Sequence, residues 1–112
     1  MKKIISLFFA AAALLSGCDD DRKIVVEQNA VILDVRSKAE FDAGHIGGAL
    51  LIPHTEIEDK VGALIPDKTT PVYLYCRSGR RSQAALEKMR RMGYEKLHNL
   101  GGLNDAAKAL GK

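Results

Sequence analysis

The chain is poor in the residue types that build several common kinds of site. It has 112 residues, no tryptophan, two cysteines and three histidines. The histidines (His45, His54 and His98) lie far apart and lack the spacing of a metal-ligand set, so we predict no metal and no cofactor. No internal repeat is present, which excludes repeat architectures. The length is that of a single domain.

Charge of one sign is also lacking. Seventeen Lys and Arg stand against 14 Asp and Glu, a formal net charge of +3. Removal of the N-terminal segment that holds Lys2 and Lys3 lowers this to +1, so the basic isoelectric point is no argument for a nucleic-acid partner. Positive charge is instead local, between Arg77 and Arg81 and at Arg90 and Arg91.

The first residues have the pattern of an export signal. Lys2 and Lys3 precede an uncharged, mainly apolar segment, residues 4–15, and two small residues follow it. That segment is too short for an ordinary membrane span, which needs about 20 residues. The alternative is a buried N-terminal helix, but we predict a signal peptide over residues 1–17.

Residues 15–18, Leu-Ser-Gly-Cys, resemble a bacterial lipobox. The resemblance implies a lipidated Cys18, a tether over residues 18–29, and a lipoprotein on the periplasmic side of the inner membrane. Ordinary cleavage would instead give a soluble periplasmic protein. If Cys18 is lipidated, Cys76 is the only free thiol and no intrachain disulfide can form.

Strand and helix patterns alternate along the rest of the chain. Apolar runs rich in β-branched residues predict strands over residues 31–35, 49–52, 72–75 and 96–99. Capping boxes and helical periodicity predict helices over residues 37–43, 55–61, 83–92 and 104–110. This order predicts an α/β domain over residues 30–112, with a mainly parallel central sheet flanked by helices. Reactive groups are then expected at the carboxyl ends of the strands.

Cys76 lies at such an end, between a buried strand and a helix. A short loop around a cysteine at a helix start directs backbone N–H groups at the sulfur and adds the helix dipole, and both favour the thiolate. Arg77, Arg80 and Arg81 add positive charge. This pattern predicts a sulfur nucleophile that meets an anionic substrate. The alternative is a structural cysteine that ends a core strand.

These residues belong to a set of short motifs in a specific order: Asp34-Val-Arg36, Glu40-Phe41, Gly44-His45-Ile46, Cys76–Ser82 and Gly101-Gly102. The set resembles the single-domain rhodaneses, sulfurtransferases that carry sulfur as a cysteine persulfide, and most of all the small periplasmic rhodaneses of the phage-shock type. The resemblance covers residues 30–105 and implies a three-layer fold. The chain departs from it at Ala106, where many members have tryptophan, so the packing near the C-terminus is expected to differ.

The resemblance also implies roles for single residues. Cys76 is the catalytic nucleophile, and the substrate-binding residues are those of its loop: Arg77, Ser78, Gly79, Arg80, Arg81 and Ser82. Arg77 and Arg80 are expected to hold the sulfonate end of thiosulfate, whereas Arg81 closes the loop. Asp34 and Arg36 are expected to support the site structurally. His45 is expected to be packed and hydrogen-bonded, with general-base chemistry as the alternative.

The function implied is transfer of sulfane sulfur from thiosulfate, or another sulfane-sulfur donor, to cyanide, a small thiol or a thiol protein, next to a membrane and without nucleic acid. A persulfide carrier or sensing module that docks to a protein partner is the alternative. A third reading, a phosphatase or arsenate reductase, needs a Cys-x5-Arg loop. Here the sixth residue after Cys76 is Ser82, so the loop is tighter and favours a sulfur-sized anion.

Overall fold

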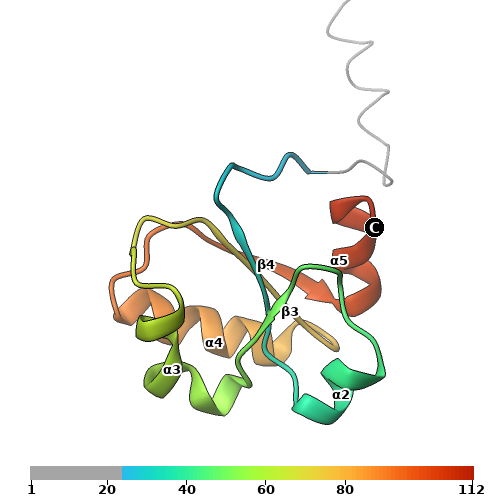
Figure 1. The fold of residues 1–112 in the computed structure, drawn as a ribbon, viewed down its shortest axis with the longest axis horizontal. Helices are drawn as coiled ribbons and strands as arrows, with labels where there is room; N and C mark the ends of the chain where they lie inside the picture. Colours follow the sequence, from blue (N-terminus) through green and yellow to red (C-terminus); the bar gives the residue numbers. More distant parts are fainter. Residues whose placement is uncertain (1–23) are drawn as a thin grey trace, which may run out of the picture.

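The computed structural model describes residues 24–112, and these form one four-stranded sheet with helices on both faces (Figure 1). The strands are β1 (Val31–Asp34), β2 (Leu50–Leu51), β3 (Val72–Cys76) and β4 (Leu97–Gly102). The helices are α2 (Lys38–Ala43), the 3-10 helix η1 (His54–Glu56), α3 (Ile57–Leu64), α4 (Arg80–Arg91) and α5 (Leu103–Leu110). The predicted α/β fold with a parallel sheet is confirmed.

All pairings in the sheet are parallel, in the order β2-β1-β3-β4. β3 is central and buried along its whole length, as its apolar sequence predicts for a parallel strand covered on both faces. Successive side chains of β3 point to opposite faces of the sheet. Leu74 and Cys76 belong to the core cluster on the side of α3 and α4, whereas Tyr75 belongs to the cluster on the side of α5.

The C-terminal helix α5 closes the second face of the sheet without the tryptophan that many rhodaneses have. Ala106 is fully buried and packs in the same cluster as Ile46 and Tyr75. Tyr75 is also fully buried, and its hydroxyl accepts a hydrogen bond from the N–H of Ile46 at 3.1 Å. The small Ala106 of α5 and the large Tyr75 of β3 therefore pack in the same buried cluster on this face of the sheet.

The first predicted helix start is confirmed and the second is wrong. Ser37 caps α2 in a complete capping box with Glu40. Thr55 does not open a helix: it lies within η1, and α3 begins after Glu56, which makes no side-chain capping bond. Pro53 fixes the backbone just before this segment, and the chain turns through η1 before the α-helix begins.

The remaining predicted elements are present with shifted ends. β2 is shorter than predicted, and β4 continues to Gly102 rather than ending near residue 99. α4 begins at Arg80, directly after Gly79, which has a left-handed φ of 96°. A positive φ is accessible to glycine at no steric cost, so the chain turns from the loop into the helix within one residue.

Two of the predictions about the N-terminal region, the signal peptide over residues 1–17 and the lipidated Cys18, lie outside the described residues. Within residues 24–112, no helix has both the length and the apolar character needed to cross a membrane.

Candidate active site

Cys76 is the last residue of β3, and its thiol faces the start of α4. The side chain is fully buried, and the N–H of Gly79 donates a hydrogen bond to Sγ at 3.0 Å. Ser78 and Arg77 lie on the exposed outer side of the same turn. The sulfur is therefore held at the carboxyl edge of the sheet by backbone, beneath a loop with exposed side chains.

Burial alone would raise the pKa of the Cys76 thiol, since it penalises the thiolate. Hydrogen bonding outweighs burial: contacts from the Ser82 hydroxyl and from the N–H groups of Ser82, Ser78 and Gly79 lower the pKa to about 7. About half of the Cys76 side chains are then thiolate at neutral pH, compared with a few per cent for a free cysteine of pKa about 8.5. A thiol with this pKa is able to act as a nucleophile near pH 7.

The glycine pair at the end of β4 makes room for this loop. A Cβ atom at Gly102 would collide with the backbone oxygen of Arg77, and one at Gly79 would lie 3.2 Å from the Cα of Gly101. The loop and the end of β4 are therefore in close backbone contact, which only glycine permits at these positions. In this structure the Gly101-Gly102 motif places the Cys76 loop against its neighbouring strand.

Asp34 and Arg36 form a buried ion pair. Arg36 donates to both carboxylate oxygens, with Nη2 at 2.7 Å from Oδ2, and the same nitrogen donates to the backbone oxygen of Gly44 at 2.7 Å. Its guanidinium group also lies 5.5 Å from the centre of the Tyr75 ring. The pair connects β1 to the end of α2, a geometry that suits structural support.

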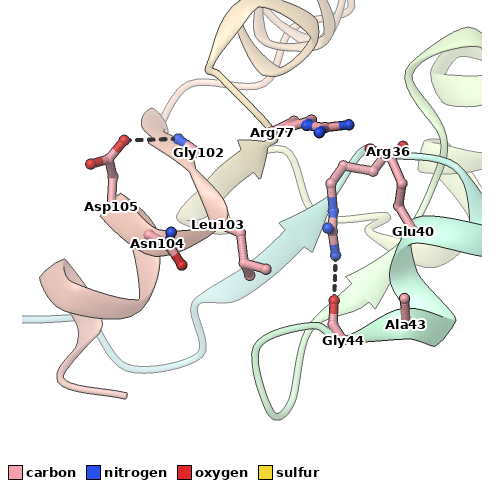
Figure 2. Close-up of a pocket in the computed structure, with 9 residues that line it drawn as sticks. All are labelled: Arg36, Glu40, Ala43, Gly44, Arg77, Gly102, Leu103, Asn104 and Asp105. Atoms are coloured by element: carbon pink, nitrogen blue, oxygen red, sulfur yellow. Dashed lines mark hydrogen bonds between the residues drawn. The ribbon is translucent and has the colours of Figure 1, made fainter.

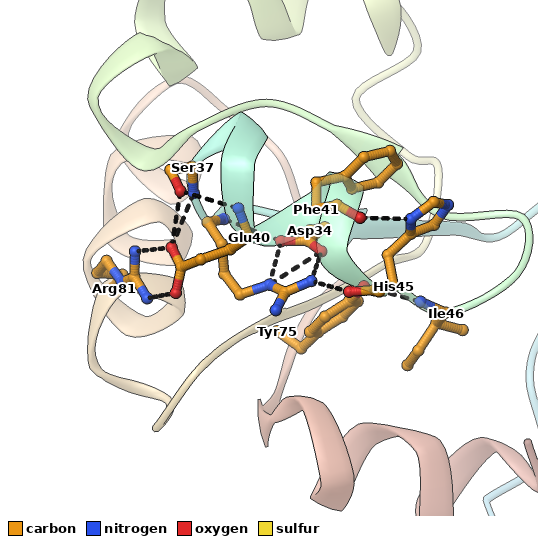
Figure 3. A network of polar contacts seen from close by, with 10 residues as sticks. Asp34, Ser37, Glu40, Phe41, His45, Ile46, Tyr75 and Arg81 are labelled. Atoms are coloured by element: carbon orange, nitrogen blue, oxygen red, sulfur yellow. Dashed lines mark hydrogen bonds and ion pairs between the residues drawn. The ribbon is translucent and has the colours of Figure 1, made fainter.

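Arg81 is held by a second ion pair, with Glu40 of α2 (Figure 3). The contact is bidentate, with distances of 2.8 Å from Nη1 to Oε1 and 3.0 Å from Nη2 to Oε2. The Arg81 guanidinium and the capping interactions with Ser37 hold the pKa of Glu40 well below its usual range. Arg81 therefore joins α4 to α2, and its charge is already paired.

The other two loop arginines differ from Arg81. The side chains of Arg77 and Arg80 are exposed and make no hydrogen bond or ion pair to another residue of the described part of the chain. Arg77 lies on the wall of a pocket of about 570 Å³, whereas Arg80 does not. Both can offer a planar pair of N–H donors to an oxyanion.

This pocket lies between the loop, α2 and the start of α5 (Figure 2). Its lining residues are Arg36, Glu40, Ala43, Gly44, Arg77, Gly102, Leu103, Asn104 and Asp105. Cys76 itself does not line the pocket, but two of the lining residues are its backbone neighbours: Arg77 follows Cys76 in the chain, and Gly102 pairs with Cys76 across the sheet. Of its charged residues, Arg36, Glu40 and Asp105 already contact protein groups, so Arg77 is the cation available to a ligand.

Asn99 of β4 is a site residue that the sequence analysis did not single out. Its amide contacts the Ser82 hydroxyl at 2.7 Å, the backbone oxygen of Gly79 at 3.0 Å and the N–H of Gly101 at 2.9 Å. A polar side chain at the end of the predicted strand 96–99, two residues before Gly101, is the sequence signal that points to it.

The histidines lie apart from the thiol. His45 is exposed, stacks on the ring of Phe41 at 3.6 Å, and its Nδ1 lies 2.8 Å from the Phe41 backbone oxygen. His98 stacks on Tyr73. In these contacts the partners of His45 and His98 are Phe41 and Tyr73, which are not residues of the Cys76 loop. Within residues 24–112, no group of three His, Cys, Asp or Glu side chains is arranged to hold a metal ion.

Comparison with known proteins gives concordant matches. The sequence profile of the family described as "Rhodanese-like domain" matches residues 12–109. The chain is 39% identical over 75 residues to the thiosulfate sulfurtransferase PspE of Escherichia coli, an alignment that covers 67% of this chain and 72% of that protein. It is 34% identical to the putative sulfur carrier protein YrkF of Bacillus subtilis, over 70% of this chain and 42% of YrkF.

Among solved structures, a rhodanese with anions from E. coli superposes with a TM-score of 0.66 at 37% identity. That match covers 68% of this chain and 89% of the other. The similarity thus extends from the sequence to the arrangement of the sheet and helices that holds the Cys76 loop.

Proposed function

Because this chain belongs to the rhodanese-like family, we propose that it is a thiosulfate sulfurtransferase that works through a persulfide on Cys76. The observation that carries the proposal is the setting of the sulfur: Sγ lies 3.0 Å from the N–H of Gly79, in a loop that lowers the thiol pKa to about 7. The sulfurtransferase activity of relatives such as PspE supports the same class of reaction.

In the first half-reaction, the Cys76 thiolate attacks the outer sulfur of thiosulfate. A bond forms between Sγ and that sulfur, and the bond to the sulfonate sulfur breaks with its electron pair leaving on sulfite. The products are sulfite and a Cys76 persulfide anion, so charge and atoms balance. The loop N–H groups that stabilise the thiolate are positioned to stabilise the persulfide as well, since both are anionic sulfur.

In the second half-reaction, cyanide or a thiolate attacks the outer sulfur of the persulfide. The bond between the two sulfurs breaks, and its electron pair returns to Cys76 as thiolate. This covalent two-step scheme predicts ping-pong kinetics. In this scheme the sulfonate end of thiosulfate binds in the pocket beside the loop. The exposed Arg77 on the wall of that pocket and the exposed Arg80 on the same loop support this part of the proposal.

The test is thiocyanate formation from thiosulfate and cyanide by the purified full-length chain, compared with its Cys76→Ser variant. We expect turnover only in the parent chain, because serine lacks a sulfur that can form a persulfide. Turnover by the serine variant would overturn the proposal. The parent rate is expected to decrease as the pH falls below about 7, because the thiolate is then protonated.

A persulfide carrier is the second candidate function, and the similarity to the putative sulfur carrier YrkF favours it. A carrier would form the persulfide but release its sulfur only to a protein partner. Stable persulfide with negligible transfer to cyanide and small thiols would favour the carrier over the enzyme.

We also propose that the protein is exported and anchored by lipid on Cys18, on the periplasmic side of the inner membrane. The basic pair at residues 2–3, the apolar segment 4–15 and the Leu-Ser-Gly-Cys sequence support this. The test is the mass of the mature protein: we expect acyl groups on Cys18 that are absent from Cys18→Ala. A mature chain cleaved at another residue and free of lipid would overturn the anchor.

A further inference from the structure

The hydroxyl group of Ser82 lies among three acceptors but has one hydrogen to donate. Its oxygen is 2.7 Å from Oδ1 of Asn99, 3.1 Å from the backbone oxygen of Gly79 and 3.5 Å from Sγ of Cys76. Ser82 is fully buried, so no bulk water reaches its hydroxyl to serve as a further partner. The direction of this single hydrogen therefore decides whether the sulfur receives a hydrogen bond from Ser82.

The orientation of the Asn99 amide is fixed by two backbone groups. The N–H of Gly101, which can only donate, lies 2.9 Å from Oδ1, and the carbonyl oxygen of Gly79, which can only accept, lies 3.0 Å from Nδ2. The reversed amide would place a donor against a donor and an acceptor against an acceptor. The atom that faces Ser82 is thus the amide oxygen, and the shortest contact of the hydroxyl is a hydrogen bond donated to Asn99.

We propose that Asn99 is a positioning residue for Cys76, because it competes with the sulfur for the Ser82 hydrogen. While Cys76 is a neutral thiol, the hydrogen stays with Asn99, and the Ser82 oxygen can accept from the S–H group. When the sulfur is anionic, the hydroxyl turns towards it, since a hydrogen bond to a charged acceptor is stronger than one to an amide oxygen. Asn99 thereby limits how much Ser82 stabilises the thiolate.

This inference rests on the proposed reactive role of Cys76, but its test needs no thiosulfate. The measurement is the pH dependence of Cys76 alkylation by iodoacetamide in the full chain, with peptide mass spectrometry to separate Cys76 from Cys18. If sulfur transfer fails and the alkylation results hold, the proposed function is wrong and the role of Asn99 stands.

The test compares the effect of Ser82→Ala in two backgrounds, the parent chain and Asn99→Leu. Leucine is similar in size to asparagine but has no acceptor, so the Gly79 oxygen and Sγ remain as acceptors for the Ser82 hydroxyl, and an anionic sulfur is the stronger of the two. In the parent chain we expect Ser82→Ala to raise the Cys76 pKa, since the Ser82 hydroxyl is one of the contacts that lower it, but by less than in the Asn99→Leu background, because part of the gain at the sulfur is offset by the loss at Asn99. In the Asn99→Leu background we expect Ser82→Ala to raise that pKa by about 1 unit, a tenfold change in the thiolate-to-thiol ratio.

A change of the loop caused by Asn99→Leu itself does not affect this result. In each background the chains with and without Ser82→Ala have the same residue at position 99, so such a change is common to both. An equal effect of Ser82→Ala in the parent and Asn99→Leu backgrounds would overturn the proposal.

Discussion

The four arginines around the Cys76 site fall into two pairs that differ in their partners. Arg36 and Arg81 are held by carboxylates, Asp34 and Glu40, in bidentate contacts. Arg77 and Arg80 are exposed and make no such contact with the rest of residues 24–112. The four side chains are chemically identical, so the residue type does not indicate the role of each arginine. The presence or absence of a carboxylate partner does.

The difference has a simple electrostatic basis. A paired arginine has its donors occupied and its charge compensated, so it stabilises the fold and attracts an anion weakly. An unpaired arginine beside a pocket keeps its donors and its full charge for a ligand. We therefore expect substitutions of the paired arginines to change stability and those of the unpaired arginines to change substrate binding.

The largest expected effect is that of Arg36→Ala. It leaves the Asp34 carboxylate buried at 0% exposure without its partner, and removing one member of a buried pair costs about 3–5 kcal/mol. Urea unfolding measures this loss. Lys38→Ala, which breaks the exposed pair with Asp42, is the matched control and should cost less than about 0.5 kcal/mol. Equal losses in the two variants would contradict a structural role for the buried pair.

The next effect concerns Arg77, the unpaired arginine that lines the pocket. Arg77→Ala should raise the KM for thiosulfate by about tenfold, the effect of losing roughly one charge-assisted hydrogen bond, with little change in unfolding free energy. Steady-state kinetics at saturating cyanide measures it. Arg80→Ala should raise the KM less, because Arg80 is not part of the pocket wall. An unchanged KM in either variant would remove that arginine from the binding role.

Arg81→Ala should lower stability by about 1 kcal/mol at neutral pH, as expected for a partly exposed ion pair with good geometry. Its KM for thiosulfate should change less than that of Arg77→Ala. Thermal or urea unfolding and the same kinetic assay give both numbers. A large rise in KM with unchanged stability would show that Arg81 behaves like the unpaired arginines. It would contradict the division of the four arginines by their partners.

The smallest effect is a pH dependence carried by Glu40. Because the folded state holds the pKa of Glu40 below its unfolded value of about 4.5, this group stabilises the fold above that pH. The contribution is lost progressively as the pH falls from about 5 towards the lower pKa of the folded state. Glu40→Gln should therefore flatten the acid side of the stability profile. A profile as steep as that of the parent chain would show that Glu40 does not titrate in this way.

Much of the fold was predictable because its signals are local. The buried strand 72–76, the capping box of Ser37 and Glu40, and the strand–cysteine–helix order each depend on residues close in sequence. The prediction that Thr55 opens a helix was wrong although its capping-box pattern is present. The residues after Pro53 form a 3-10 helix, and α3 therefore begins only at Ile57.

The site was less predictable, because its decisive contacts join residues far apart in the chain. Arg81 was expected to close the loop, and only the fold shows that its partner is Glu40, on another helix. Asn99 was not singled out, since its role depends on β4 running beside the loop. Sequence motifs thus pointed to Cys76 as the candidate nucleophile, whereas the pairing of charges and the direction of hydrogen bonds required the three-dimensional arrangement.

The most direct test of sulfur transfer through Cys76 is the mass of the Cys76 peptide after brief exposure of the full chain to thiosulfate, followed by addition of cyanide. We expect the gain of one sulfur atom on Cys76, an equal amount of released sulfite, and loss of that sulfur as thiocyanate when cyanide is added. Thiocyanate formation during which Cys76 never carries the extra sulfur would contradict transfer through Cys76.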